Sequence, residues 1–311
     1  MNLTNKHALE HINSLQNIAC ELSHYGVVKV SGDDAVKLLQ GQTSCDIHKL
    51  DSANASLGAM CNVQGRIHAI FYIVHWRDGY FLIMPHEVIE HFISRLSMYA
   101  VFFKAEITNV SEEFQLWGSC KKSETPEDSP ESSMLAVTTQ DNGLELHLHS
   151  LFNASIHLIP TQHVNQLDNL LSESTLADHK SWDYVEIQAR IPMIYQNTIE
   201  QLLPHFIGLD MVGGISFDKG CYTGQEIIAR MHYRGKLKTH ACLAWTTGEK
   251  TIQPNSKLIN QDNKTVGEVV RSAPYAGKTY CLISLADKAL DQPVFIEHSQ
   301  ADHLPIELIS Q

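Results

Sequence analysis

The chain has 311 residues, of which 43% are hydrophobic and 19% charged, an ordinary composition for a globular protein with room for two or three domains. Its formal net charge of −12 excludes a protein that coats nucleic acid or an anionic membrane with its whole surface. The seven cysteines are odd in number and widely spaced, which favours reduced thiols in a cytosol over a disulfide framework.

The first 110 residues predict strands and helices in alternation. A strand is expected at Tyr25–Val30, ended by Gly32, and a short helix follows it, capped by Asp33 or Asp34 and ended by Gly41. Further strands are expected at 56–62, 67–76 and 80–84, and apolar residues at helical spacing predict a helix at 86–100. This order is typical of an α+β unit with a mostly antiparallel sheet.

The rest of the chain divides into a mixed segment and an all-strand segment. Residues 120–133 are almost free of apolar side chains and are expected to form a flexible surface loop. Strands are then expected at 134–139, 144–149 and 155–159, and helices at 161–172 and 178–188. From residue 239 onward, expected strands at 241–246, 257–260, 265–272, 279–285 and 293–297 predict a small β-barrel.

No apolar run approaches the length of a membrane span; the longest, at 69–74, has the size of a strand. The first residues contain no apolar segment of the kind that a secretory signal needs. We therefore expect a cytoplasmic protein without a membrane partner.

The most informative stretch is the octapeptide Lys219–Glu226, KGCYTGQE. Thr223 and Glu226 have the spacing of a capping box, which predicts a helix from about Gly224 to Met231. Cys221 would then lie two residues before a helix start and close to Lys219 in sequence, where positive charge favours the thiolate. The alternative is that Cys221 is a small buried residue and that the glycines around it only form a tight turn.

Other chemistry is less well supported. The chain contains 18 histidines, and His147 and His149 would face the same side of a strand. No third ligand, CxxC or HExxH accompanies them, so no metal site is predicted. There is no GxSxG and no dinucleotide-binding loop. Basic residues between Lys219 and Lys238 form either a local anion-binding patch or an ordinary solvated face.

The octapeptide and several other motifs resemble the YgfZ family of folate-binding proteins, relatives of the T-protein (aminomethyltransferase) of the glycine cleavage system. Around the octapeptide the resemblance rests on Gly213–Phe217, Ile227–Arg230 and Arg234–Gly235. Elsewhere it rests on Gly32–Ala35, Leu38–Thr43, Asp46, Gln64–Arg66, Ala189–Pro192 and Gly267–Ser272. The match covers nearly the whole chain and is weakest between about residues 111 and 180.

The resemblance implies an α+β, aminomethyltransferase-like fold: two interleaved mixed domains at 1–110 and 111–238, and a C-terminal β-barrel at 239–311, packed around a central folate cavity. It also implies a tetrahydrofolate-binding accessory protein that supports assembly or repair of iron–sulfur clusters, with iron–sulfur enzymes or assembly proteins as partners and tRNA thiolation as an indirect result. Cys221 would be the reactive residue, kept ionised by Lys219. Candidate folate contacts are Trp182, Tyr25, Tyr222, Gln225, Arg230 and Arg234.

Three departures from the family pattern matter. Arg190 occupies a position where the family pattern has glycine, and Tyr25 one where it has tryptophan. The acidic residue that the T-protein relatives use after the 64–66 turn is absent from Ile67–Phe71, and His68 is the remaining candidate for a base. A protein that is not a classical enzyme is therefore expected; the alternatives are a folate-dependent one-carbon transferase and a tRNA-binding module.

Overall fold

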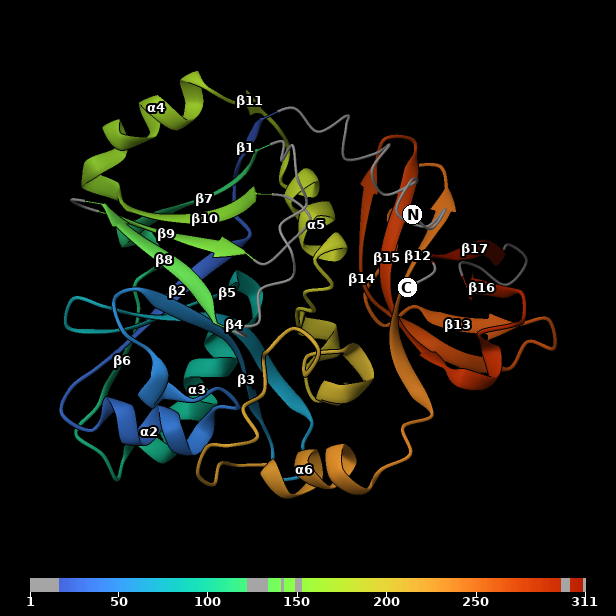
Figure 1. The fold of residues 1–311 in the computed structure, drawn as a ribbon, viewed down its shortest axis with the longest axis horizontal. Coiled ribbons are helices and arrows are strands. Elements are labelled where there is room, and N and C mark those ends of the chain that lie inside the picture. Colours follow the sequence, from blue (N-terminus) through green and yellow to red (C-terminus); the bar gives the residue numbers. More distant parts are fainter. Residues whose placement is uncertain (1–16, 122–133, 141–142, 149–152, 298–302, 310–311) are drawn as a thin grey trace.

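The computed structural model describes residues 17–121, 134–140, 143–148, 153–297 and 303–309. These residues form one large sheet of 11 strands and one closed barrel, with helix α5 (His179–Gln188) between them (Figure 1). The strand order in the sheet is β11-β1-β7-β10-β9-β8-β3-β4-β5-β2-β6. The predicted α+β class with a C-terminal barrel is confirmed.

Two groups of strands make up the large sheet. The first group contains β2 to β6, namely Tyr25–Ser31, Asn54–Cys61, Ile67–Trp76, Gly79–Pro85 and Glu106–Asn109. The second group contains β7 to β11, namely Phe114–Lys121, Leu135–Gln140, Gly143–Leu148, Asn153–Pro160 and Thr175–Leu176. All the strand pairs are antiparallel except that of β11 with β1 (Ile18–Glu21).

Strand β1 makes the two groups interleave. It precedes β2 in the chain, yet it pairs with β7 and β11 of the second group. In the described part of the chain, the ladder between β3 and β8 joins the groups and pairs Asn54 with Ala136 and Ala55 with Leu135. The interleaving is therefore as predicted, while the domain boundaries at 110 and 238 stay predictions.

Helices cover the sheet because their apolar residues recur on one side. In α3 (Ile89–Ala100) the buried residues are Ile89, Phe92 and Leu96, and the Phe92 ring meets Phe71 of β4 edge-on at 5.6 Å. The other helices of this part are α2 (Ala35–Gln42) and α4 (Leu167–Ser172). Nine of the ten residues of β4 are buried, so this strand is covered on both faces.

The barrel has the order β12-β15-β14-β13-β16-β17. Its strands are Thr239–Thr247, Lys257–Asn260, Thr265–Tyr275, Lys278–Ala286, Val294–Glu297 and His303–Ile309, from β12 to β17. The sequence analysis missed β17, which pairs with both β16 and β12 and so closes the barrel. Without it two strand edges would stay open.

Most expected elements occur within one to three residues of their predicted bounds. The expected loop at 120–133 is partly wrong, because Cys120 and Lys121 belong to β7; residues 122–133 lie outside the described part. The expected helices at 86–100 and 161–172 each begin as a 3₁₀ helix, η2 (His86–Val88) and η4 (Thr161–Gln166). Among the helices described, none is both long and apolar enough to cross a membrane.

Candidate functional site

Three segments that carry the sequence motifs meet in one place. The Thr223 backbone N–H donates to the Gly41 carbonyl at 3.1 Å, and its hydroxyl donates to Gln42 Oε1 at 3.0 Å. The Ser216 N–H donates to the Ser44 carbonyl at 2.9 Å. The turn between β3 and β4 completes the group, since Gly65 lies against Ile227 of helix α6 (Gln225–Arg234). The cysteine loop, Lys219–Gly224, is thus supported by residues far away in the chain.

Lys219 is the main anchor of this loop. Its side chain is buried, with 7% exposure, and its ammonium donates to the carbonyls of Gln40 at 2.8 Å, Thr43 at 2.6 Å and Cys45 at 2.8 Å. Burial lowers the pKa of Lys219 to about 8, against smaller opposing effects of Cys45 and Asp46. The ammonium also lies 4.9 Å from the ring centre of the buried Tyr222.

The expected role of Lys219 needs correction. No hydrogen bond or ion pair joins it to Cys221 in the described structure, and its three donors are taken by backbone carbonyls. A compact ammonium surrounded by carbonyls fixes the backbone beside it. Lys219 therefore holds the loop in shape without contacting the Cys221 thiol, and its effect on the ionisation of that thiol stays a prediction.

The predicted capping box is also wrong. Helix α6 begins at Gln225, and Gly224 precedes it with φ of +86° and no side-chain cap. Thr223 is bonded to Gln42, and Glu226 pairs with Arg230 at 2.8 Å. A Cβ at Gly224 would lie 2.5 Å from the Asn62 carbonyl oxygen, so this position requires glycine both for its backbone angle and for its closeness to the β3–β4 turn.

Cys221 is accessible. All seven cysteines fall within the described residues, and Cys221 is exposed while the other six are buried. The alternative of a buried structural cysteine is therefore wrong for this residue. Its neighbours on α6 are placed as follows: Gln225 Oε1 accepts from the Tyr222 N–H at 3.2 Å, and Arg230 and Arg234 are exposed.

A second constellation surrounds the buried carboxylate of Glu186 on α5, which has 0% exposure. It accepts from Tyr25 at 2.8 Å, from Tyr72 at 2.6 Å and from the Arg271 guanidinium at 2.9 Å. We call Tyr25, Tyr72, Glu186 and Arg271 the carboxylate cluster. Burial, followed by the charge of Glu186, raises the pKa of both tyrosines, so they remain protonated donors.

The carboxylate cluster joins the sheet to the barrel. Arg271 lies on barrel strand β14 and also donates to Asp183 at 2.8 Å and to the Ile191 carbonyl at 3.2 Å. The sequence analysis singled out Tyr25 but missed Tyr72, Glu186 and Arg271. The available signal was that Arg271 and Ile191 each belong to a family motif, and the structure brings these two motifs into contact.

Trp182 is a core residue in this structure. It is fully buried on α5, and a Cβ at Gly118 of β7 would lie 2.4 Å from its ring. Its indole nitrogen has no hydrogen-bond partner among the described residues. Stacking of a pterin on Trp182 therefore stays a prediction, and it requires α5 and β7 to separate.

A cavity of about 510 Å³ lies between the segment after α5 and the barrel. Its lining consists of Glu87, Tyr195, Gln196, Asn197, Ile252, Gln253, Pro254 and Ser272. Burial raises the pKa of Tyr195, and Arg271 is the strongest opposing influence, which places this wall of the cavity close to the carboxylate cluster. The volume is within the usual range for small-molecule sites.

Two histidine interpretations can be compared with the structure. His68 is buried and its Nδ1 lies 3.0 Å from Nε2 of His91; burial lowers its pKa despite the nearby Glu200. The side chain of His68 is therefore buried, and the role of a base considered for it stays a prediction. Nε2 of His147 lies 2.8 Å from the Thr138 hydroxyl and its Nδ1 lies 3.1 Å from the Ser155 hydroxyl, while His149 lies outside the described residues.

No family model matches the chain. It is 31% identical over 275 residues to the tRNA-modifying protein YgfZ of Photobacterium profundum, a match that covers 85% of this chain and 82% of the relative. The chain belongs to the YgfZ family. The protein YgfZ of Colwellia psychrerythraea is 28% identical over 308 residues and is covered to 94%.

The extent of the family match varies. With YgfZ of Vibrio vulnificus the identity is 32% over 219 residues, and the chain spans 65% of that relative's length. The fold of this YgfZ family member is shared with aminomethyltransferase T of the glycine cleavage system from Bartonella henselae, with a TM-score of 0.72 at 12% identity. That likeness covers 99% of this chain and 88% of the other.

Proposed function

We propose that this YgfZ family member is a tetrahydrofolate-binding accessory protein that supports assembly or repair of iron–sulfur clusters and, through them, tRNA modification. The names of the relatives, tRNA-modifying proteins, support the last part. The observation that carries the proposal is Cys221, the one exposed thiol of seven, presented by a loop that a buried lysine fixes. A thiolate there is a ligand for iron or a nucleophile toward sulfur or a one-carbon unit.

We place the folate in the 510 Å³ cavity beside the barrel. A pterin is flat and carries amino and ring N–H donors on one edge. Glu87 supplies a carboxylate acceptor for such an edge, Tyr195 an aromatic ring, and Ile252 with Pro254 an apolar surface. Arg230 and Arg234, the sequence candidates for the glutamate tail, do not line this cavity.

The folate assignment is tested by calorimetric titration of tetrahydrofolate into the full chain. Glu87→Gln removes the charge that accepts from the pterin edge and is expected to weaken binding by about tenfold, since hydrogen bonds to charged groups contribute about 1.5–3 kcal/mol. The matched control is Glu90→Gln. Glu90 is exposed, lies about one helical turn after Glu87 and does not line the cavity. If the two variants bind tetrahydrofolate with equal affinity, the assignment of folate to this cavity is wrong.

The cysteine assignment is tested in cells whose only copy of the gene carries Cys221→Ala. Activities of iron–sulfur enzymes and the level of thiolated tRNA are expected to fall, while Cys242→Ala, a buried cysteine of the barrel, leaves them unchanged. Incubation with an aminomethyl donor and tetrahydrofolate separates the transferase alternative. Methylenetetrahydrofolate production by the purified protein would contradict the accessory role.

A further inference from the structure

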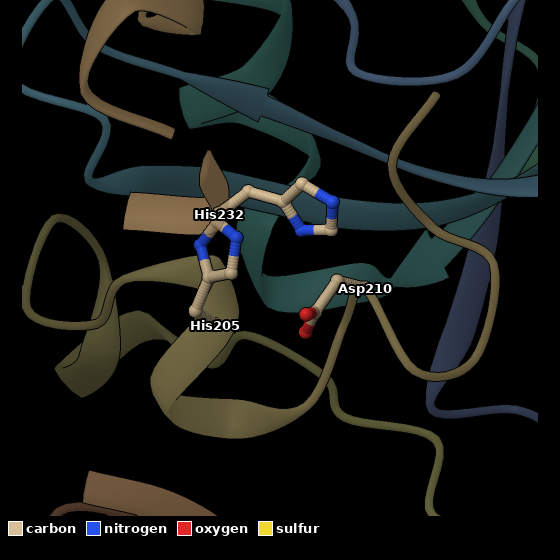
Figure 2. Close-up of side chains that lie close together, drawn as sticks. All are labelled: His205, Asp210 and His232. Atoms are coloured by element: carbon tan, nitrogen blue, oxygen red, sulfur yellow. The ribbon is translucent and has the colours of Figure 1, made fainter. Parts of the chain in front are cut away.

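Three side chains with metal-ligating atoms gather beside the cysteine loop, away from the cavity proposed for folate. His205 belongs to the 3₁₀ helix η6 (Pro204–Ile207), Asp210 to the turn after it, and His232 to α6. One nitrogen of each histidine and one carboxylate oxygen all lie within 4.8 Å of one another. Figure 2 shows the three side chains arranged around a common space.

The local structure holds these ligands in place. Gly208 ends η6 with φ of +73°, which reverses the chain so that Asp210 returns toward His205. A side chain at Gly208 would press on Ala241 of β12, since its Cβ would lie 2.9 Å from the alanine Cβ. The third ligand is oriented by Phe217, whose ring stacks on His232 at 3.8 Å with an angle of 20°.

Three buried polar atoms of this group lack hydrogen-bond partners in the described part of the chain. His205 is 3% exposed, and neither of its ring nitrogens nor Oδ1 of Asp210 has a hydrogen bond within the described structure. Such buried groups cost about 1–3 kcal/mol each when left unsatisfied. Burial lowers the pKa of His205, opposed by Asp210 and aided by His232, which favours the neutral imidazole that donates a lone pair.

We propose that His205, Asp210 and His232 bind a divalent transition-metal ion of the zinc or iron(II) class. Two imidazoles with one carboxylate are typical ligands of these ions, whereas magnesium and calcium prefer oxygen ligands alone. Ligand bonds of about 2.0–2.2 Å at tetrahedral angles put two ligand atoms of one ion roughly 3.3–3.6 Å apart, so ligand atoms that lie up to 4.8 Å apart approach by about 1 Å on binding. The exposed His232 has the freedom to move by this amount.

A metal ion at this site would restrain α6, the helix that directly follows the cysteine loop. The ion would tie η6 to α6, the helix that follows Gly224, while three protein ligands leave coordination positions for water or a small anion. We therefore infer a site that both rigidifies α6 and remains open to a further ligand.

The experiment titrates Zn²⁺, and separately Co²⁺ as a visible-absorption probe, into the full chain after treatment with a chelator. One ion per chain and a Co²⁺ spectrum of low-symmetry nitrogen and oxygen ligation are expected. Asp210→Asn and His232→Ala should each weaken Zn²⁺ binding by at least about tenfold. His48→Ala, an exposed histidine outside the group, is the matched control.

Two further measurements test whether Zn²⁺ binds at this group of residues. The same titration with Cys221→Ala should give unchanged affinity, because the exposed thiol is not a ligand of this ion. Hydrogen exchange of the α6 amides should slow when Zn²⁺ is added to the wild type and stay the same in His232→Ala. Absence of saturable binding by the wild type, or binding that survives in the folded His232→Ala variant, would overturn the site.

Discussion

At the scale of single residues, buried polar side chains determine the shape of the cysteine loop. In place of water, three backbone carbonyls accept hydrogen bonds from the Lys219 ammonium. All three belong to the segment 40–45 and none to the cysteine loop itself. The charge is thereby used to hold two remote segments together. This arrangement explains how a loop with two glycines, Gly220 and Gly224, can present Cys221 in one position.

The lowered pKa of Lys219 predicts how stability depends on pH. The amine titrates at about 8 in the folded chain and at its ordinary 10.5 when unfolded, so between these values the unfolded chain binds more protons. The free energy of unfolding of the wild type should therefore rise with pH from about 8 to 10.5, relative to Lys219→Met. Denaturant unfolding at a series of pH values checks this; parallel pH profiles of the two proteins would contradict it.

The departure from the family pattern at Arg190 strains the backbone. Its φ of +59° lies in the left-handed region, which explains why a glycine is expected there. Arg190→Gly should stabilise the fold by about 0.5–1 kcal/mol, the strain of about 1–2 kcal/mol less the entropy cost of glycine. Thermal unfolding measures the change, and Arg190→Ala, which retains the strain, should show no comparable gain.

At the scale of elements, helix α5 packs against both the large sheet and the barrel, and five of its ten residues are buried. Trp182 packs on Gly118 of β7, while Tyr184 stacks on Tyr275 of the barrel at 4.3 Å. Its Glu186 is shared between the sheet and the barrel. An element with so many partners tolerates little change in the volume of its neighbours.

Gly118→Ala tests this tight packing. The added methyl would meet the Trp182 ring at 2.4–2.9 Å and should destabilise the fold by about 1–3 kcal/mol, with a change in tryptophan fluorescence. Gly41→Ala is the matched control, because no atom lies within 4 Å of its added Cβ and the position is helical. That control should stabilise the fold by about 0.5–1 kcal/mol, and a similar loss in both variants would refute the packing argument.

At the scale of the whole molecule, the carboxylate cluster is the polar connection between the large sheet and the barrel. Arg271 reaches from β14 to Asp183 and Glu186, and it is itself 1% exposed. A buried charge that loses its partner is strongly unfavourable, so this connection couples the stabilities of the two parts.

Arg271→Met should lower the free energy of unfolding by about 3–5 kcal/mol, because the carboxylate of Glu186 is left buried without its cation. The double variant Arg271→Met, Glu186→Gln should recover part of that loss, since a neutral amide still meets Tyr25 and Tyr72. Urea unfolding of the single and double variants measures the coupling. Strictly additive losses would show that Arg271 and Glu186 are not coupled across the two parts.

The sequence by itself was sufficient for most local elements, the barrel and the family, and it singled out Cys221, the cysteine that the structure leaves exposed. Strand alternation, helical spacing and turn glycines are local signals, and the octapeptide is a contiguous motif. Strands β1, β6, β7, β11 and β17 were missed, because such strands owe their pairing to partners distant in the chain; β1 pairs with β7, and β17 with β12.

Only the tertiary structure decided where the polar side chains point. Lys219 turns to carbonyls about 175 residues away, Glu186 meets Tyr25 across 161 residues, and the His205–Asp210–His232 group draws on three segments. Such encounters depend on how whole elements pack, and the period of a sequence pattern contains no information about them. The physical reason is that burial, not sequence spacing, forces a polar group to find whichever partner the fold brings within reach.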